Sequence, residues 1–231
     1  MILPDEILDI IFKYVNNIKL IVSFRNILSN NTIKYILDNN IENITNEVSS
    51  NNIPLFKIIL DINYLVNWDN ISRYQIISED FIREFANNVD WCEISMTQNL
   101  SENFIREFTT QIYWDKISWK QKLSEDFIRE FANNVDWYNI SGHQILSEEF
   151  IREFQKNVSW YKISEYQILS EEFIREFANK VDWYNISEHQ TLSEDFIREF
   201  INKFDDSEDW NKISEYQILS EDFIKDFANK V

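Results

Sequence analysis

A nine-residue motif, seen as LSEEFIREF at 146–154, returns at a fixed interval along most of this 231-residue chain. Seven tryptophans mark the starts of the repeats: Trp68, Trp91, Trp114, Trp137, Trp160, Trp183 and Trp210. Consecutive starts lie 23 residues apart, except that an insertion, Asp205–Glu208, lengthens the last interval to 27. Similar units at a short fixed period indicate a solenoid, in which each repeat packs against its neighbours.

Each repeat contains two segments with helical periodicity. In the first, the tryptophan, an isoleucine, a serine and a glutamine recur at i, i+3, i+4 and i+7, one face of a helix. An aspartate precedes the tryptophan as a predicted N-cap in four repeats: Asp90, Asp136, Asp182 and Asp209. In the second segment, a serine is the predicted N-cap, and apolar residues follow in one stripe, as Phe173, Ile174, Phe177 and Val181. We predict a first helix of about two turns, a tight link and a second helix of about three turns.

Composition supports the same fold class. The chain has one glycine and two prolines, whereas β-hairpins and sharp turns depend on both residue types. The apolar surface of one repeat is too small to offset the entropy of ordering it, so repeats must stack. We therefore predict an all-α fold, an αα-hairpin solenoid (superhelix) of about seven regular 23-residue repeats plus degenerate N-terminal repeats. The predicted segments are 1–45, F-box-like or capping helices; 46–67, a degenerate repeat; and 68–231, the regular solenoid.

The N-terminal stretch LPDEILDIIFKYV, at 3–15, resembles the start of an F-box: Leu-Pro, an acidic pair and an amphipathic helix. Many of the residues in this chain are those that AT-rich codons encode. Taken with the repeats, this composition makes the chain similar to F-box-and-repeat proteins of giant, mimivirus-like DNA viruses. The resemblance implies docking to the Skp-type adaptor of a cullin ubiquitin ligase, while the repeats bind an unknown target. The residues that it implies for adaptor binding are Leu3, Pro4, Ile7, Leu8 and Ile11.

Two features of this stretch leave an alternative open. The usual Val-Cys-x-x-Trp core of an F-box is missing, and Val22, Phe24 and Ile27 are loose substitutes for it. The stretch also aligns without gaps to the repeat sequence LSEDFIREFANNV, as a capping repeat would. The alternative function is a structural or self-assembling solenoid with no link to ubiquitin.

Charge and side-chain chemistry disfavour several classes of function. The net charge of −18 disfavours nucleic acid and anionic membranes as partners and favours a basic one. A single cysteine, Cys92, fits a reducing compartment, so we expect an intracellular protein, in the host cytoplasm under the viral interpretation. No apolar run approaches the ~18 residues that span a membrane. Cys92, His143 and His189 are far apart in sequence, so we predict no metal, no cofactor and no catalytic residue.

Two polar residues, a serine and a glutamine on the first helix, are the same in all seven repeats. One interpretation is a ladder that binds a peptide. The other is structural: the serine permits close helix approach, and the glutamine bonds a neighbouring turn. The paired acids, such as Glu171 and Glu172, precede an arginine such as Arg175 and are interpreted as a solvated face rather than as acid–base or calcium chemistry.

Variation between repeats concentrates on the first helix, in the residues around the constant serine. A constant scaffold with one variable surface is typical of recognition, although drift of exposed residues is the alternative. We predict that a protein partner contacts Arg73, Met96, Trp119 and His143. Trp119 is the strongest candidate, because aromatic residues are frequent interface anchors.

The last repeat keeps its complete apolar set: Trp210, Ile213, Leu219, Phe223, Ile224 and Phe227. Solenoids usually close with a repeat whose outer face is polar. An uncovered apolar face favours association, so we expect either a homodimer through the C-terminal repeat or a frayed final helix pair.

Overall fold

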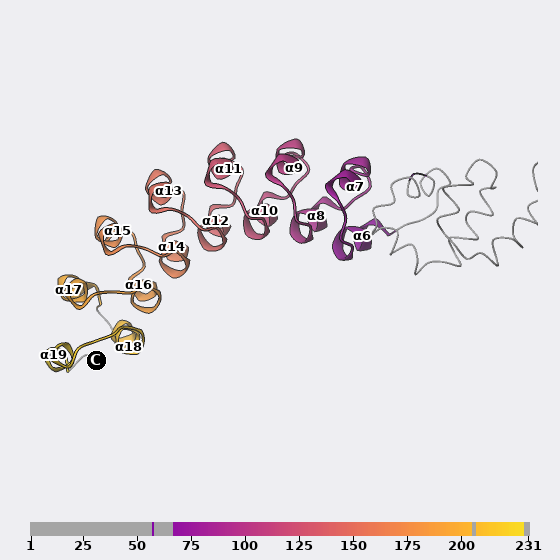
Figure 1. Cartoon of the computed structure of the whole chain (residues 1–231). Coiled ribbons are helices and arrows are strands. Elements are labelled where there is room, and N and C mark those ends of the chain that lie inside the picture. Colours follow the sequence, from indigo (N-terminus) through magenta and orange to yellow (C-terminus); the bar gives the residue numbers. More distant parts are fainter. Residues whose placement is uncertain (1–56, 58–66, 205–206, 229–231) are drawn as a thin grey trace, which may run out of the picture. The chain divides into compact units, whose positions relative to one another are not determined.

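Figure 1 shows the computed structural model, which describes residues 57, 67–204 and 207–228. The chain divides into two compact units, Met1–Tyr113 and Trp114–Val231, and each is described by itself. Every element in the described residues is a helix, with no strand among them, and the elements recur as helix pairs. The predicted all-α fold of αα-hairpin repeats is confirmed for this part of the chain. The predictions for 1–45 and 46–67 lie outside the described residues, apart from Lys57 and Asn67.

In the N-terminal unit the helices are α6 (Trp68–Tyr74), α7 (Glu79–Glu84), α8 (Trp91–Thr97) and α9 (Glu102–Glu107). In the C-terminal unit they are α10 (Trp114–Lys120), α11 (Glu125–Glu130), α12 (Trp137–His143), α13 (Glu148–Glu153), α14 (Trp160–Tyr166), α15 (Glu171–Glu176), α16 (Trp183–His189), α17 (Glu194–Glu199), η1 (Ile201–Lys203), α18 (Ser207–Tyr216) and α19 (Glu221–Asp226).

The C-terminal unit is built as two rows of helices. The first helices of its repeats, α10, α12, α14, α16 and α18, follow one another along the inner side of a curve, and the second helices form the outer row (Figure 1). Each first helix packs against the next one in its row. In the N-terminal unit, α6 packs against α8 in the same way.

Local capping sets the starts of most helices as predicted. The side chains of Asp90, Asp136 and Asp182 accept the N–H three residues on, at 2.8–3.0 Å. Serines cap the second helices, as Ser170 does by accepting the N–H of Phe173 at 3.2 Å. The predicted cap at Asp209 is wrong, because α18 begins at Ser207 and Asp209 lies inside it. The insertion therefore lengthens this first helix at its N-terminus.

The second helices are shorter than the predicted three turns. Each has six residues, as in Glu79–Glu84, and is followed by a separate turn in which the Val89 N–H bonds the Phe85 carbonyl at 3.1 Å. The carbonyl of Ala86 in this turn accepts the indole N–H of Trp91, from the next repeat, at 2.9 Å. The helix ends where its backbone turns to meet the following repeat.

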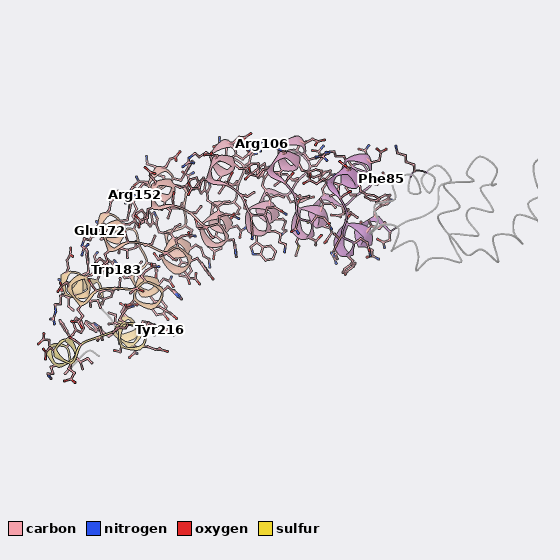
Figure 2. The ribbon with its side chains drawn as sticks, in the orientation of Figure 1. Phe85, Arg106, Arg152, Glu172, Trp183 and Tyr216 are labelled. Carbon is pink, nitrogen blue, oxygen red and sulfur yellow. The ribbon has the colours of Figure 1, made fainter. Side chains whose placement is uncertain are left out.

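Aromatic side chains fill the space between the two rows. Trp183 is labelled in Figure 2. The centroid of its indole lies 6.3 Å from the ring centroid of Phe196 and 5.1 Å from that of Phe200. Phe196 and its equivalents in the other repeats are fully buried, as is the isoleucine that follows them in all but the last repeat. In that last repeat the equivalent residue, Ile224, is 45% exposed. The predicted pairing of two chains through this repeat stays a prediction.

The constant glutamine joins each repeat to the one before it. The Nε2 of Gln167 donates to the carbonyls of Ser141 and Gln144 at 2.9 and 2.8 Å, and its Oε1 accepts the N–H of Leu146 at 3.0 Å. The same three bonds are made by the glutamines of four further repeats: Gln98, Gln144, Gln190 and Gln217. These carbonyls belong to the C-terminus of the preceding first helix, so the glutamine caps a helix of another repeat.

The constant serine fixes the first helix inside its own repeat. Ser164 is fully buried; its hydroxyl donates to the Trp160 carbonyl at 2.8 Å and accepts the N–H of Asp182 at 2.9 Å. Asp182 caps the next first helix, so this hydroxyl also positions the entry to the following repeat. The structural interpretation is confirmed for the glutamine, which bonds a neighbouring turn. The peptide-binding interpretation is wrong for the buried members of both ladders, such as Ser164 and Gln167, because their polar atoms are already paired, whereas Ser214 of the last repeat is exposed.

The second helices are joined by charged side chains. Arg175 lies 3.4 Å from Glu171 in its own helix, as predicted, and its Nε also donates to Glu199 of the next repeat at 2.8 Å. Glu171 in turn accepts the backbone N–H of Ser193, in the next repeat, at 2.6 Å. This outer row is a solvated face, and it also connects consecutive repeats.

We expect Gln167→Leu to destabilise the chain by at least about 2–4 kcal/mol. It leaves two carbonyls and one N–H without their partner, each costing about 1–3 kcal/mol when buried. Urea denaturation should show a lower midpoint, and amide exchange should accelerate first in α12 and α14. Gln111→Leu is the control, since Gln111 is exposed and its change should stay within about 0.5 kcal/mol. Equal stability of the two variants would contradict the capping role.

Candidate protein-binding surface

The inter-repeat bonds decide which side chains are left for another molecule. The tryptophan, serine, glutamine, arginine and glutamates of the repeats are engaged within the array, whereas several aromatic residues around them on the first helices keep much of their surface exposed. In the C-terminal unit these positions carry five tyrosines that are 39–56% exposed: Tyr138, Tyr161, Tyr166, Tyr184 and Tyr216. They stand on α12, α14, α16 and α18, and we call them the tyrosine face. Figure 2 shows Tyr216 on the side of α18 away from α19.

One cluster of this face surrounds Lys162. Its Nζ lies 5.2, 5.3 and 4.8 Å from the ring centroids of Tyr138, Tyr161 and Tyr166. The same ammonium lies 3.0 Å from a carboxylate oxygen of Glu165. A cation held against ring faces is attracted by the ring quadrupole. The three rings are therefore held around a common centre, and each keeps about half of its surface exposed.

Gly142, the one glycine of the chain, makes room for this cluster. A Cβ added there would lie 3.4 Å from the Lys162 Cδ and 3.7 Å from the Tyr166 Cδ2. The equivalent residue in later repeats is a glutamate, Glu165 or Glu188. Both distances are ordinary van der Waals contacts, so the absence of a side chain at Gly142 leaves open space beside the Lys162 stem and the Tyr166 ring.

The ion pair at the centre of the cluster shifts its titration. Burial raises the pKa of Glu165, but hydrogen bonds from Lys162 and Tyr166 outweigh it, and the pKa stands below its ordinary value. The hydrogen bond to Glu165 raises the pKa of Lys162 against the effect of burial. The hydrogen bond to the same carboxylate raises the pKa of Tyr166. At neutral pH the cluster thus holds a charged pair with no net charge.

A second cluster, around Lys212, has the same kinds of group, but with two tyrosines and with a carboxylate from the preceding repeat. Its Nζ lies 5.5 Å from the ring centroid of Tyr184 and 5.4 Å from that of Tyr216, and 3.1 Å from a carboxylate oxygen of Glu188. The hydrogen bond to Glu188 raises the pKa of Lys212. Both lysines come two residues after the tryptophan of their repeat, with one repeat between them. The same chemistry is therefore presented twice along one row of helices.

The structure brings together two of the four predicted partner-binding residues. Trp119 is 44% exposed, and its ring meets that of His143 edge-on at 6.1 Å. His143 in turn stacks on Tyr166, with centroids 6.5 Å apart. Trp119 and His143 are therefore continuous with the Lys162 cluster through Tyr166.

The other two predicted residues lie in the N-terminal unit. Arg73, on α6, forms an ion pair with Glu93 of α8 and lies 5.8 Å from the ring centroid of Tyr74. Met96, on α8, is 40% exposed. The pairing of Arg73 with Glu93, like that of Glu188 with Lys212, shows that the variable residue after the constant serine contacts the next repeat. Part of the variation on this surface thus belongs to packing between repeats.

Sequence reasoning missed the two lysines and the isoleucines of the links. Lys162 and Glu165 are three residues apart on one helix, and this spacing was a readable signal. The Lys212–Glu188 pair joins two repeats, so only the stacking register reveals it. Isoleucines follow three of the constant glutamines of the C-terminal unit, and all three are 95–97% exposed: Ile145, Ile168 and Ile218.

The predicted adaptor-binding residues, Leu3, Pro4, Ile7, Leu8 and Ile11, lie outside the described residues. Within the described part of the chain, no group of three or more His, Cys, Asp or Glu side chains is placed to hold a metal ion. A search of the same residues finds no helix with the length and apolar character to cross a bilayer. Comparison with protein-family models, curated proteins and solved structures finds no match for this chain.

We expect Lys162→Met to raise the pKa of Glu165, because it removes the ammonium and leaves the burial. A depressed folded pKa stabilises the fold above the unfolded value of about 4.3, and that stabilisation is lost as pH falls through the folded pKa. In Lys162→Met, the free energy of unfolding should therefore fall less steeply as the pH is lowered. Carboxyl NMR titration measures the shift, and Lys156→Met, at an exposed lysine, should leave the pKa of Glu165 unchanged. An unchanged pKa in Lys162→Met would contradict the pairing.

Proposed function

We propose that this chain is a protein-binding repeat protein that holds its partner on the tyrosine face of the C-terminal unit. The observation that carries the proposal is the pair of tyrosine clusters around Lys162 and Lys212. They lie on helices whose constant residues are used for packing between repeats. Half-exposed aromatic rings on a rigid scaffold lose little entropy when they bind. Stacked helical repeats of this kind are typical of binding scaffolds rather than of enzymes, and we propose no catalytic activity.

The balance of charge supports the same surface. Lys162 and Lys212 are each paired with a carboxylate at 3.0–3.1 Å, so the charged groups beneath the rings are already compensated. Tyrosine is enriched at protein interfaces, where its ring contributes area and its hydroxyl a hydrogen bond. The outer row of second helices instead exposes carboxylates such as Glu172, whose side chain is 82% exposed. Exposed acidic residues of this kind are depleted at the centres of interfaces.

Trp119→Ala and Tyr184→Ala should each weaken partner binding by about 1–2 kcal/mol, the loss expected for an interface anchor. The full chain, immobilised, captures partners from a cell lysate, and titration of each captured protein then gives its affinity for the variants. Tyr113→Ala is the matched control, because Tyr113 is 49% exposed but belongs to the N-terminal unit. A partner that binds all four chains equally would exclude the tyrosine face as its site.

The F-box-like start of the chain supports a more specific proposal, which rests on the resemblance of 3–15 alone. In it, the repeats hold a target while Leu3, Pro4, Ile7, Leu8 and Ile11 dock a Skp-type adaptor of a cullin ubiquitin ligase. The alternative is that the same residues cap a structural solenoid.

A purified Skp-type adaptor separates these alternatives. If the F-box proposal holds, the full chain binds the adaptor with a Kd of tens of micromolar or tighter, and Ile7→Asp abolishes binding by placing a charge in an apolar contact. Isothermal titration measures both, with Trp119→Ala as a control that should bind normally. No binding by the unchanged chain would leave the capping interpretation.

A further inference from the structure

The single glycine of the chain lies on a helix of the tyrosine face. Gly142 is in the last turn of α12, at the position that follows the constant serine. The equivalent residues of the other six repeats all carry a side chain: Arg73, Met96, Trp119, Glu165, Glu188 and Glu215. Glycine is less favourable in a helix than alanine, because it loses more conformational freedom on folding. This one repeat therefore gives up helix stability beside the ring of Tyr166.

The fold does not require the glycine. Its backbone is helical, whereas the conformation that favours glycine is left-handed. An added Cβ would lie 3.4 Å from the Cδ and 3.7 Å from the Cγ of Lys162, and 3.7 Å from the Cδ2 of Tyr166, which are ordinary van der Waals distances. An alanine would therefore fit. What the glycine provides is open space over the α12 backbone, and such space permits a ligand to approach the backbone closely.

Aromatic rings border this space. Tyr166 is a direct neighbour of Gly142, and His143 stacks on Tyr166 with ring centroids 6.5 Å apart. Trp119 meets His143 edge-on at 6.1 Å. These rings come from α10, α12 and α14, which follow one another in the inner row (Figure 1). Trp119 is 44% exposed and Tyr166 53%, so a side chain placed over Gly142 would have ring surface beside it.

The charged groups beside the space are already paired. The Lys162 ammonium lies 3.0 Å from a carboxylate oxygen of Glu165, and the two side chains are only 16% and 19% exposed. The atoms of Lys162 that border Gly142 are methylene carbons of its stem. The Lys162–Glu165 pair therefore gives the space no net charge that would attract a cation or an anion. Methylene groups and ring surfaces instead match an uncharged aromatic side chain, which packs against both.

We propose that the space over Gly142 receives an aromatic side chain of the partner protein, which packs against the Lys162 stem and the Tyr166 ring. This inference rests on the proposed function and names the group that the partner contributes. Residues that anchor an interface fill pockets near its centre and are enriched in tryptophan and tyrosine. The small residue at 142 is therefore part of the binding surface and not of the packing between repeats.

NMR can observe this site directly, because the chain contains one glycine and two histidines. In the full chain with isotope-labelled glycine and histidine, the amides of Gly142 and His143 report on the site. His189, which occupies the position of His143 two repeats on, is the internal control. The probe is para-cresol, the side chain of tyrosine without its backbone. We expect it to shift the Gly142 and His143 resonances and not that of His189, with a Kd in the roughly millimolar range of a small fragment.

A charged probe tests the chemistry of the space. Methylguanidinium carries the charged group of arginine and should leave all three resonances unchanged at the same concentration, because Glu165 already holds Lys162. Shifts caused by methylguanidinium and not by para-cresol would contradict the proposal.

Variants at position 142 separate binding from stability. Gly142→Ala should raise the urea midpoint, because alanine favours the helix. The same change should weaken para-cresol binding by about fourfold, which corresponds to one methyl group of lost contact. Gly142→Glu, which introduces the residue type of the later repeats, should abolish the shift at His143. Glu188→Ala, at the same position two repeats on, is the matched control and should leave the shift at His143 unchanged.

Three outcomes of these measurements would overturn the inference. They are a lower urea midpoint in Gly142→Ala, which would show that the glycine serves the fold; an equal shift of His189, which would show non-specific adsorption; or unchanged para-cresol affinity in both variants at 142. The proposed function is decided separately, by captured partners and the Trp119→Ala and Tyr184→Ala chains. If captured partners depend on those residues but para-cresol shifts neither Gly142 nor His143, the surface is right and the aromatic anchor is wrong.

Discussion

The fold depends on a helix cap supplied by another repeat. Helices commonly end at a glycine in the left-handed conformation, which satisfies their last carbonyls, but this chain has one glycine. The first helices end instead at a glutamine in extended conformation, such as Gln144, and the next glutamine, Gln167, bonds the carbonyls left open. A single repeat therefore cannot finish its own first helix. The repetition in the sequence follows from this requirement as much as from the sharing of apolar surface.

Much of the structure could be predicted because its causes lie within one repeat. Helix periodicity, the serine caps and the buried stripe from Phe173 to Val181 are set by residues less than one repeat apart, and all are confirmed. The second helices end earlier than predicted, in a turn where a carbonyl such as that of Ala86 accepts the indole N–H of Trp91. The apolar stripe continues through the equivalent turn to Val181, so periodicity alone does not mark the end of the helix. The start of α18 also differed, because an insertion of helix-compatible residues extended the helix backward.

The candidate site was only partly predictable for the same reason. Variation around the constant serine pointed to one face of the first helices, and Trp119 and His143 do lie together on it. The lysine clusters depend on which residue of one repeat meets which residue of the next, as Lys212 meets Glu188. That register is fixed by the buried glutamines and not by the variable residues themselves. A surface assembled across repeats can therefore be located from sequence variation, while its chemistry needs the stacking geometry.

The same register connects binding to stability. The two lysine clusters are separated by two joints, one made by Gln190 between α14 and α16 and one made by Gln217 between α16 and α18. Separation of either joint would move one cluster away from the other, so both joints set the spacing of the clusters. Since a ligand stabilises the state that it binds, occupancy of the tyrosine face favours closed joints. In an array stabilised by nearest-neighbour contacts, that effect is concentrated at these joints and is not spread over the chain. The glutamines thus hold the repeats together and also set the distance between the two lysine clusters.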